Sequence, residues 1–396
     1  MKFYDVCIIG GGHSGLVAAL AFAKNNFRVL CVESKTISTS SKKDLELRTT
    51  AHLLPTVSFL KTIGVWKHLE AYSCPLETLK IINEKDTESS SPKITNNIFQ
   101  SNEINQNNFG YNVPLEKSVG ILRELVKSHE NIIMIDNTSL TSSYLENNLR
   151  IIQLSNGNFI KTKLVIGADG ANSVVRSLSG IEVFEKDTGQ VALTFNVKHT
   201  LEHKNISNEL YKVGGPLTTI PILDDNKNLH SSIVWMNNKE VTEQLLSLNK
   251  KNFALKLNER SLSILGEMSP ITTITELPVR IMVSQRFVEE RIALIGEAAH
   301  KLPPIGAQGF NMSVKDIETI LHLCIKNAKN IGSSKMLNLY QFKRYPEIFG
   351  KAFSVGFLNK LAASEQPVFQ NLRALGLDAI DNIGPLKQSI MRFGLG

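Results

Sequence analysis

The sequence predicts a mixed α/β protein, in which a doubly wound domain is interrupted by a sheet-rich insertion and followed by a helical C-terminal segment. A glycine cluster at residues 10–15 separates a short β-branched run from an Ala/Leu-rich stretch. Short alternating apolar runs, separated by Gly, Pro and Asn turns, fill residues 181–285. Apolar residues then recur every three or four positions in the tail. These three patterns are typical of a βαβ unit, a sheet and amphipathic helices.

The first domain opens with a strand, a turn, a helix and a second strand. We expect the first strand at Tyr4–Ile9, the helix at Ser14–Lys24 and the second strand at Arg28–Glu33. Asn25 and Asn26 stand where the helix must stop, and asparagine tolerates the left-handed conformation better than most residues. This order predicts a parallel βαβ unit.

The later elements follow from periodicity and from turn-forming residues. The Ser-, Thr- and Lys-rich stretch Lys35–Glu46 is predicted to be an exposed loop, and Thr87–Asn108, which is rich in Ser and Asn, a surface excursion rather than a core element. We expect helices at 53–64 and 115–126, strands at 132–135, 149–154, 164–166, 191–197, 231–235 and 292–295, and a mostly helical tail from Met336 onward.

Composition limits the classes of function. The chain has 396 residues, 42% of them apolar, so it can bury a large core and is not intrinsically disordered. Its 44 basic and 37 acidic residues leave a thinly spread charge of +7, which argues against a nucleic-acid-binding protein. Four cysteines without a CxxC pair predict neither a disulfide framework nor a zinc site, and favour a reducing compartment. No apolar stretch reaches the length that crosses a bilayer.

The glycine cluster carries the first functional signal. Gly10-x-Gly12-x-x-Gly15 follows a strand and opens a helix, as in the dinucleotide fingerprint. The first glycine makes the tight turn, the second lets the backbone approach a pyrophosphate, and the third lets helix and strand pack closely. Glu33, about twenty residues on, is placed to accept hydrogen bonds from ribose hydroxyls. The alternative is a glycine turn with a structural role alone.

Two later segments distinguish FAD from NAD through a resemblance. Residues 164–176, LVIGADGANSVVR, resemble the DGxxSxxR signature of the FAD-dependent aromatic hydroxylases, the group A flavoprotein monooxygenases. Residues 291–316, RIALIGEAAHKLPPIGAQGFNMSVKD, resemble their second flavin motif followed by PxxGxGxN. The resemblance implies a Rossmann-like FAD-binding domain of the para-hydroxybenzoate hydroxylase type, with a second, sheet-rich substrate domain inserted in it.

The resemblance also implies a set of cofactor-binding residues. Arg48 matches the arginine that holds the FAD pyrophosphate, Glu297 the carboxylate that binds the ribityl chain, and Asp169 the aspartate of the DG segment. For Arg48 the alternative is a solvated arginine, and for Asp169 a simple turn cap. The full predicted set is Gly10, Gly12, His13, Ser14, Gly15, Glu33, Ser34, Arg48, Asp169, Glu297, Pro304, Gly306, Gly309, Phe310 and Asn311.

One position departs from the family pattern, and two histidines near the motifs are expected to have no catalytic role. The family usually has Asp where this chain has Glu297, so the sugar contact is expected to be longer or water-bridged while the charge is retained. His13 is expected to be a tolerated variable position beside the cofactor, and His300 a packed, hydrogen-bonded core histidine. No side chain is predicted as catalytic acid, base or nucleophile, and no metal is expected, because the flavin carries the chemistry.

Flanking segments narrow the resemblance to the ubiquinone-biosynthesis branch. These are RTTAHLLPTVSFLKTIGVW, FGYNVPLEKSVGILREL and PLKQSIMRFGLG. They imply hydroxylation of the aromatic ring of a polyprenyl phenol through a flavin hydroperoxide, with O2 and with NAD(P)H or another electron donor as co-substrates. The alternatives are a soluble aromatic-ring hydroxylase of the same fold and a catalytically silent FAD-binding scaffold of the quinone-biosynthesis assembly.

The predicted organisation follows from these assignments. We expect the FAD-binding domain at residues 1–75, 109–180 and 286–335, the substrate domain at 76–108 and 181–285, and the helical segment at 336–396. The expected location is cytoplasmic, with room for a peripheral contact with the inner face of the membrane, a quinone-biosynthesis complex and a homo-oligomer.

The tail carries an apolar stripe made of Val368, Leu372, Leu375, Ala379, Ile383 and Leu386, flanked by Arg373, Lys387 and Arg392. Its spacing of three or four residues predicts one face of a helix. Two interpretations stay open from the sequence. The stripe either packs against the body of the enzyme or a sister subunit, or contacts a membrane or partner proteins.

Overall fold

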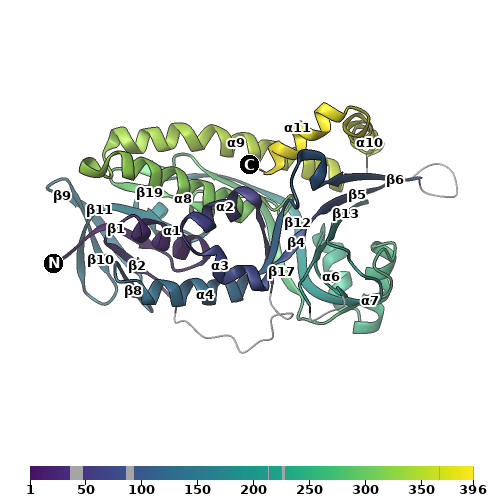
Figure 1. Cartoon of the computed structure of the whole chain (residues 1–396), viewed down its shortest axis with the longest axis horizontal. Helices are drawn as coiled ribbons and strands as arrows, with labels where there is room; N and C mark the ends of the chain where they lie inside the picture. The colour runs from purple at the N-terminus through teal and green to yellow at the C-terminus, as the bar shows by residue number, and fades with distance from the viewer. Residues whose placement is uncertain (36–47, 86–92, 213, 225–227, 365, 396) are drawn as a thin grey trace.

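The structure is a computed structural model that describes residues 1–35, 48–85, 93–212, 214–224, 228–364 and 366–395 (Figure 1). In this described part the strands form an eight-stranded, a nine-stranded and a three-stranded sheet. Helices flank the sheets and make up the C-terminal segment (Figure 1). The predicted mixed α/β architecture is therefore confirmed.

The eight-stranded sheet has a parallel centre. Its path runs β18-β19-β11-β1-β2-β8, and β10 and β9 attach to β11. The parallel strands are β1 (Lys2–Ile9), β2 (Val29–Val32), β8 (Ile132–Ile135), β11 (Phe159–Gly167) and β19 (Ile292–Leu294). Antiparallel pairs are made by β9 (Leu140–Glu146), β10 (Leu149–Leu154) and β18 (Val288–Glu289). The predicted strands of this domain are confirmed, with shifts of a few residues at their ends.

The register of this sheet brings the predicted motifs to one edge. Ile9 pairs with both Val32 and Gly167, and Gly167 pairs with Leu294. The last residues of β1, β2, β11 and β19 therefore lie side by side. Ligands of open parallel sheets bind at this carboxyl edge. The glycine turn, Glu33, the DG segment and the segment containing Glu297 all follow these strand ends.

Helix α1 (His13–Lys24) lies between the sheet and the helices α4 (Leu115–Ser128) and α8 (Gln308–Lys326). Its residues from Gly15 to Ala23 are all buried, which explains why it is apolar all round rather than amphipathic. The helix ends at Asn25, and Asn26 has a φ of +63°. The predicted stop at these two asparagines is confirmed.

A smaller layer packs beside these helices. The three-stranded sheet is formed by β3 (Thr49–Leu53), β4 (Cys74–Leu76) and β7 (Gly110–Pro114), in the order β3-β7-β4. It is followed or flanked by α2 (Leu54–Thr62), α3 (Trp66–Leu69) and the 3-10 turn η2 (Glu70–Tyr72). Strand β3 continues directly into α2, so the position of Arg48 just before β3 is fixed relative to the first domain.

The nine-stranded sheet follows the path β20-β17-β12-β15-β14-β13-β5-β6, and β16 attaches to β12. Its core on one face contains Leu193, Phe195 and Trp235, packed with Phe253 and Leu257 from the neighbouring helices. The strands are β5 (Thr78–Lys85), β6 (Lys93–Gln100), β12 (Val183–His199), β13 (Ile206–Lys212), β14 (Gly215–Pro221), β15 (His230–Asn238), β16 (Met268–Pro270), β17 (Thr275–Ser284) and β20 (His300–Lys301), and the helices are α6 (Lys239–Ser247) and α7 (Lys250–Arg260).

One prediction in this region is wrong. Within Thr87–Asn108, described from residue 93 onward, the chain forms β6 and the 3-10 turn η3 (Ser101–Ile104) rather than a surface excursion. Strand β6 pairs with β5 along its whole length, and Phe99 and Ile104 are buried in a cluster with Met391 of the tail. Residues 87–92 and most of the predicted loop Lys35–Glu46 lie outside the described residues. Helices α6 and α7 were also not expected inside the sheet-rich region.

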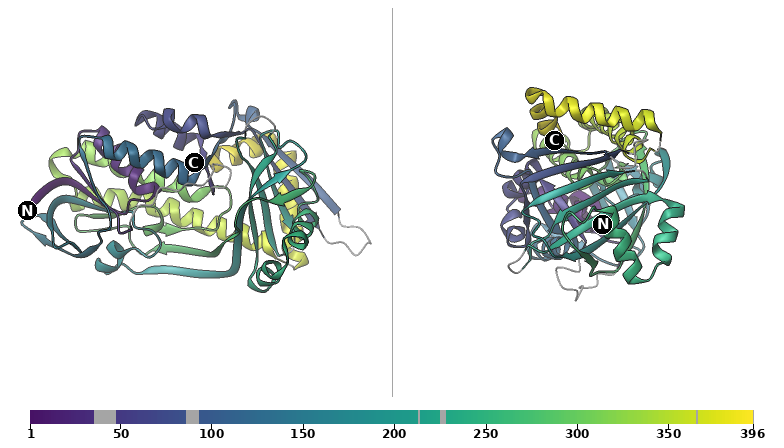
Figure 2. Two further views of the ribbon diagram at one scale, coloured as in Figure 1. Left: turned by 90° about the horizontal axis from the view of Figure 1, so that it is seen from below. Right: turned by 90° about the vertical axis from the view of Figure 1, so that its right-hand side faces the viewer.

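The remaining elements are helical, as predicted for the tail. They are α5 (Val174–Leu178), η4 (Gly296–Ala298), η5 (Ala328–Asn330), α9 (Ser334–Ala363), α10 (Pro367–Asn382) and α11 (Gly384–Leu395). Helix α9 lies along the upper side in Figure 1, and the yellow helices α10 and α11 lie on that same side in both figures (Figures 1 and 2). No helix in the described ranges is long and apolar enough to cross a membrane.

The tail stripe faces outward. Val368 is 66% and Leu375 64% exposed, and Leu372, Ile383 and Leu386 are also exposed, so the interpretation that the stripe packs against the body of its own chain is wrong. Arg373 does not flank an exposed stripe, since it is buried and donates to Asn83 and to the carbonyls of Leu361 and Ala362. That arginine instead fixes α10 to β5 and to the end of α9. The predicted domain boundaries stay a proposal.

Candidate cofactor-binding site

The glycine turn between β1 and α1 shows why two of its glycines are required. Gly10 has a φ of +110°, and a Cβ there would lie 2.4 Å from the carbonyl oxygen of Ala168. A Cβ on Gly15 would lie 1.9 Å from the carbonyl oxygen of Gly10. Gly12 differs, because no described atom lies within 4 Å of its ideal Cβ and its φ is −78°. The chain itself therefore leaves open the space beside Gly12.

The first turn of α1 is suited to an anion. Its N-cap is Gly12, no side chain in the described residues caps it, and the first turn holds no acidic residue. The backbone N–H groups of such a turn attract negative charge. Ser14, half-buried in this turn, lies near Gly296 at the end of the neighbouring strand.

Glu33 stands directly beside the glycine turn. Its Oε2 accepts a hydrogen bond from the backbone N–H of Gly11 at 2.6 Å. Its Oε1 accepts from the N–H of Lys35 at 2.9 Å and from the hydroxyl of Ser34 at 3.4 Å. These bonds fix the carboxylate at the carboxyl end of β2, beside the glycine turn, and cofactor contacts of Glu33 and Ser34 stay a prediction.

Arg48 reaches the same region from the start of β3. Its Nε lies 3.5 Å from Oε1 of Glu116 in the first turn of α4, and its carbonyl oxygen accepts from the N–H of Leu115 at 2.7 Å. The side chain is 44% exposed, so it can turn toward an anion at modest cost. A pyrophosphate contact by Arg48 remains a prediction.

The DGxxSxxR segment forms a closed turn after β11. Asp169 accepts from the hydroxyl of Ser173 at 2.5 Å and from the N–H of Val175 at 3.0 Å, while Gly170 has a φ of +81°. Arg176 donates to the carbonyl oxygens of Ala171 and Ala298. Ser173 is the N-cap of α5, and the carboxylate of Asp169 closes the turn by accepting from that serine and from the first turn of the helix. Its contact with a cofactor stays a prediction.

A buried charge cluster supports the segment that carries Glu297. Oδ2 of Asp316 accepts from the N–H of Gly296 at 3.0 Å and lies 2.7 Å from Nε2 of His300, and Oδ1 accepts from Nε of Arg344 at 2.7 Å. Burial alone would raise the pKa of Asp316, but the neighbouring His300 and Arg344 lower it. The cluster fixes the strand end, and Glu297 itself is exposed there. His300 is a hydrogen-bonded core histidine, as predicted.

The loop before α8 provides a second uncapped helix start. Gly306 has a φ of +63° and the N-cap Ala307 one of +55°, and among the described residues no side chain caps α8 and no acidic residue stands in its first turn. No described atom lies within 4 Å of a Cβ built on Gly309. Pro304 precedes this turn. The N–H groups of α8 can therefore face a ligand.

Asn311 joins α8 to β3. Its Nδ2 donates to the carbonyl oxygen of Ala51, and its Oδ1 accepts from the N–H of Leu53, both at 2.9 Å. Sequence reasoning placed Asn311 in the loop motif but did not predict this link. The loop, β3 and the glycine turn thus converge on one region.

Aromatic rings fill the space between these three segments. His13 stacks on Phe310 at 3.8 Å with an angle of 2°, and the ring of His52 lies 4.9 Å from Phe310. His13 also bonds to the hydroxyl of Ser118 at 2.9 Å. Burial and the neighbouring His52 lower the pKa of His13, and burial lowers the pKa of His52 to about 3, so both rings are neutral at pH 7. No local sequence signal pointed to His52 or Ser118, because their partners are distant in the chain.

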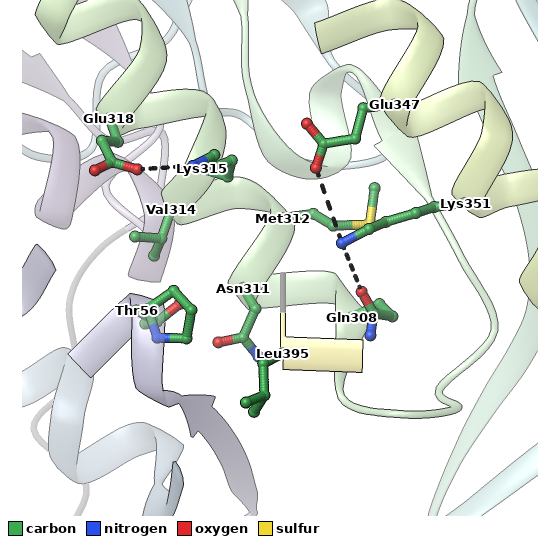
Figure 3. Close-up of a pocket in the computed structure, with 11 residues that line it drawn as sticks. Thr56, Gln308, Asn311, Met312, Val314, Lys315, Glu318, Glu347, Lys351 and Leu395 are labelled. Atoms are coloured by element: carbon green, nitrogen blue, oxygen red, sulfur yellow. Dashed lines mark hydrogen bonds and ion pairs between the residues drawn. The ribbon is translucent and has the colours of Figure 1, made fainter. Parts of the chain in front are cut away.

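A pocket lies beside the first turn of α8 (Figure 3). Gln308 donates to the carbonyl oxygens of Gly306 and Gly394, and its Oε1 accepts from Nζ of Lys351 at 3.3 Å. The end of α11 therefore contacts the loop that opens α8. The pocket is lined by Pro55, Thr56, Gln308, Asn311, Met312, Val314, Lys315, Glu318, Glu347, Lys351 and Leu395.

Comparisons with known proteins show which proteins this chain resembles. The family model described as the FAD binding domain matches residues 3–348. The 3-demethoxyubiquinol 3-hydroxylase of Escherichia coli (strain K12) is 27% identical over 99% of this chain and 98% of its own length. The ubiquinone hydroxylase UbiL of Rhodospirillum rubrum is 25% identical over 100% of this chain and 90% of its own length.

Solved structures agree on the fold. The p-nitrophenol 4-monooxygenase PnpA of Pseudomonas putida DLL-E4 superposes with a TM-score of 0.79 at 17% identity, covering 100% of this chain and 99% of that protein. The probable FAD-dependent monooxygenase pqsL of Pseudomonas aeruginosa gives a TM-score of 0.78 at 17% identity, over 96% and 100% of the two chains. The fold that the sequence resemblance implied is confirmed.

Proposed function

The chain belongs to the FAD binding domain family and is an FAD-dependent monooxygenase, and we propose that it hydroxylates the aromatic ring of a polyprenyl phenol on the route to ubiquinone. The observation that carries the proposal is similarity to ubiquinone hydroxylases along nearly the whole of both chains, rather than over the cofactor segments alone. The proposal also includes the predicted cofactor-binding residues, whose geometry supports it.

The residues at the sheet edge fit FAD. An open space beside Gly12 in front of the uncapped start of α1 suits a pyrophosphate. Glu33 is held at the adjacent strand end, where it can accept from ribose hydroxyls, and the exposed Glu297 can accept from the ribityl chain. Arg48 supplies a cation near the same turn. These features together support binding of a dinucleotide that also carries a sugar-alcohol chain.

The chain positions the cofactor rather than reacting itself. When bound, FAD would supply the redox chemistry by which one oxygen atom of O2 enters the ring, with electrons from the reductant. The start of α8 offers N–H groups and a partial positive charge that stabilise an anionic ring system. Asn311 holds that start against β3, and the neutral His13 stacks on Phe310 behind it. No side chain of this set is proposed as a nucleophile.

We propose that the phenol ring binds between the loop before α8 and the nine-stranded sheet. Ile305 of that loop packs near the buried Ala192, Met236 and Val279 of the sheet. This apolar wall supports a site for an aromatic ring and a prenyl tail, each buried CH2 of which contributes about 0.8 kcal/mol. Affinity dominated by the tail leaves the ring position loosely specified.

The proposal extends to partners. A polyprenyl phenol dissolves in the bilayer, so we infer that the protein binds peripherally to the cytoplasmic side of a membrane. NAD(P)H or another electron donor binds transiently as the reductant. A quinone-biosynthesis complex and a homo-oligomer are compatible with the outward-facing stripe on α10.

The deciding experiment follows an oxygen label. The FAD-loaded protein is mixed with a reductant, 18O2 and either a prenylated phenol in detergent or a short hydrophilic phenol, and the products are weighed by mass spectrometry. We expect one 18O atom in the prenylated ring. Turnover of the hydrophilic phenol alone would favour a soluble aromatic hydroxylase, and unlabelled product or no turnover of a flavin-loaded protein would favour a silent scaffold.

A further inference from the structure

The outer face of α9 carries an unusual line of apolar side chains. Phe342 is 74% exposed, Phe353 73%, Phe349 51% and Phe357 49%. The spacing of three or four residues puts them on one side of the helix. We call this set the α9 stripe; it consists of Leu339, Phe342, Pro346, Phe349, Phe353 and Phe357.

The inner face of α9 already supplies its packing. Met336, Tyr340, Ile348 and Ala352 are buried in the main core, and Tyr340 donates to the carbonyl oxygen of Leu294 at 2.9 Å. The helix is therefore apolar on both sides. Such helices are normally covered all round, and exposed apolar patches of this kind mark contact surfaces. Among the described residues, nothing covers the α9 stripe.

The charges along α9 are basic apart from Glu347. Glu347 is the only acidic residue in the sequence of α9, and it pairs with Arg344 and Lys351 on the inner side. Lys335, Lys343 and Lys360 are exposed along the helix. Residues 334–396 hold eight basic and four acidic residues, so this segment contributes four of the seven net positive charges. The stripe thus lies in a basic environment.

The type of cation distinguishes the partners. Lysine is depleted in the cores of protein–protein interfaces, which prefer arginine. Helices that lie in the headgroup region of a bilayer combine Phe and Leu with flanking lysines, whose long stems reach outward to lipid phosphates. The exposed face of α9 has the second composition.

We propose that the α9 stripe inserts into the headgroup region of an anionic lipid bilayer. Helix α10, which lies on the same upper side in Figure 1, also carries exposed apolar side chains, namely Val368, Leu372 and Leu375. The α9 stripe runs from Leu339 to Phe357, so the contact is about 27 Å long along the helix. This inference deepens the proposed function. It rests on that function in one respect, because a membrane contact serves an enzyme whose substrate is dissolved in the membrane. It names the surface from which a membrane-dissolved substrate is reached.

The test measures vesicle binding of the full-length, FAD-loaded protein. Wild type and the double variant Phe342→Gln/Phe353→Gln are floated with phosphatidylcholine vesicles, with or without phosphatidylglycerol. We expect wild type to bind the anionic vesicles and the double variant to bind about a hundredfold more weakly, at roughly tenfold per phenylalanine. Phe184→Gln is the matched control, since Phe184 is 55% exposed on β12 and outside the stripe. It should bind like wild type.

A second variant tests the charges. Lys335→Gln/Lys343→Gln should lower the preference for anionic over neutral vesicles by about fivefold for each lysine. The unfolding temperature of every variant is recorded as a check on folding. Because the replaced side chains are exposed, the unfolding temperature should not change.

The outcomes separate the partners and the two proposals. Failure of wild type to bind anionic vesicles at low salt overturns the inference, as does equal weakening by Phe184→Gln. A dimer of the wild type that the double variant dissociates, without vesicle binding, would assign the stripe to a second copy instead. No phenol is present in this assay, so its result stands apart from that of the 18O2 experiment.

Discussion

Replacing Gly12 with Ala should separate cofactor binding from folding. No described atom lies within 4 Å of the added Cβ, and the φ of −78° suits alanine, but alanine is a poorer N-cap than glycine, so the two effects offset and the apoprotein should stay within about 1 kcal/mol of wild-type stability. The methyl group instead fills the space through which a pyrophosphate reaches the N–H groups of α1. Losing one or more charge-assisted hydrogen bonds costs roughly 1.5–3 kcal/mol, or about ten- to hundred-fold in FAD affinity.

The assay combines FAD titration of the apoprotein, followed by flavin fluorescence, with urea unfolding of the same samples. Gly120→Ala is the control, since Gly120 lies exposed in α4 and no described atom lies within 4 Å of its Cβ either. This variant should lower neither the FAD affinity nor the stability of the apoprotein. Gly10→Ala is the opposite control, because its Cβ meets the carbonyl oxygen of Ala168 at 2.4 Å and should destabilise the apoprotein itself. Wild-type FAD affinity in Gly12→Ala would refute the placement of the pyrophosphate.

Three further predictions concern binding, pH and the tail. Glu33→Ala and Arg48→Ala should each weaken FAD binding about ten- to hundred-fold in the same titration, and unchanged affinity in both would move the cofactor elsewhere. Burial lowers the pKa of His52 from 6.5 to about 3. Between these two pH values His52 is therefore protonated only in the unfolded chain, and the stability of the apoprotein falls as the pH falls, by up to about 1.4 kcal/mol per pH unit. His52→Leu should remove that contribution in urea titrations across the window, and an unchanged slope would mean that water reaches the ring. Arg373→Met should cost roughly 3 kcal/mol and expose α10 to proteolysis, because Arg373 ties α10 to Asn83 and to the end of α9, whereas an unchanged melting temperature and cleavage pattern would contradict this role.

Local patterns made the sheet edge predictable. Gly10, Glu33 and Asp169 each follow a short buried strand, and parallel strands bring such ends together, so their convergence follows from the order of the elements along the chain. Helix α1 was predictable from its Ala- and Leu-rich sequence between the glycine turn and the two asparagines.

Features that depend on distant partners could not be predicted. Strand β6 is rich in Asn and Thr and is held by its pairing with β5, so its own sequence resembles a loop. Arg344 and Asp316 stand within two helices, where a lone charge usually indicates a solvated face, yet they meet in the core. The stack of His13 on Phe310 joins residues almost 300 positions apart. Likewise, the sequence of α9 does not show which face packs against the core, so the outward direction of the α9 stripe could not be predicted.

The place of β5 and β6 in the nine-stranded sheet has a consequence for synthesis. They pair with each other at once, but β5 finds its other neighbour, the parallel strand β13, about 130 residues later. At about 5–20 residues per second, the ribosome leaves that edge open for roughly 6–25 seconds. An open strand edge is a template for pairing with another chain. The nascent chain is therefore most vulnerable to aggregation before residue 212 emerges, and a chaperone acting in that interval would protect this edge.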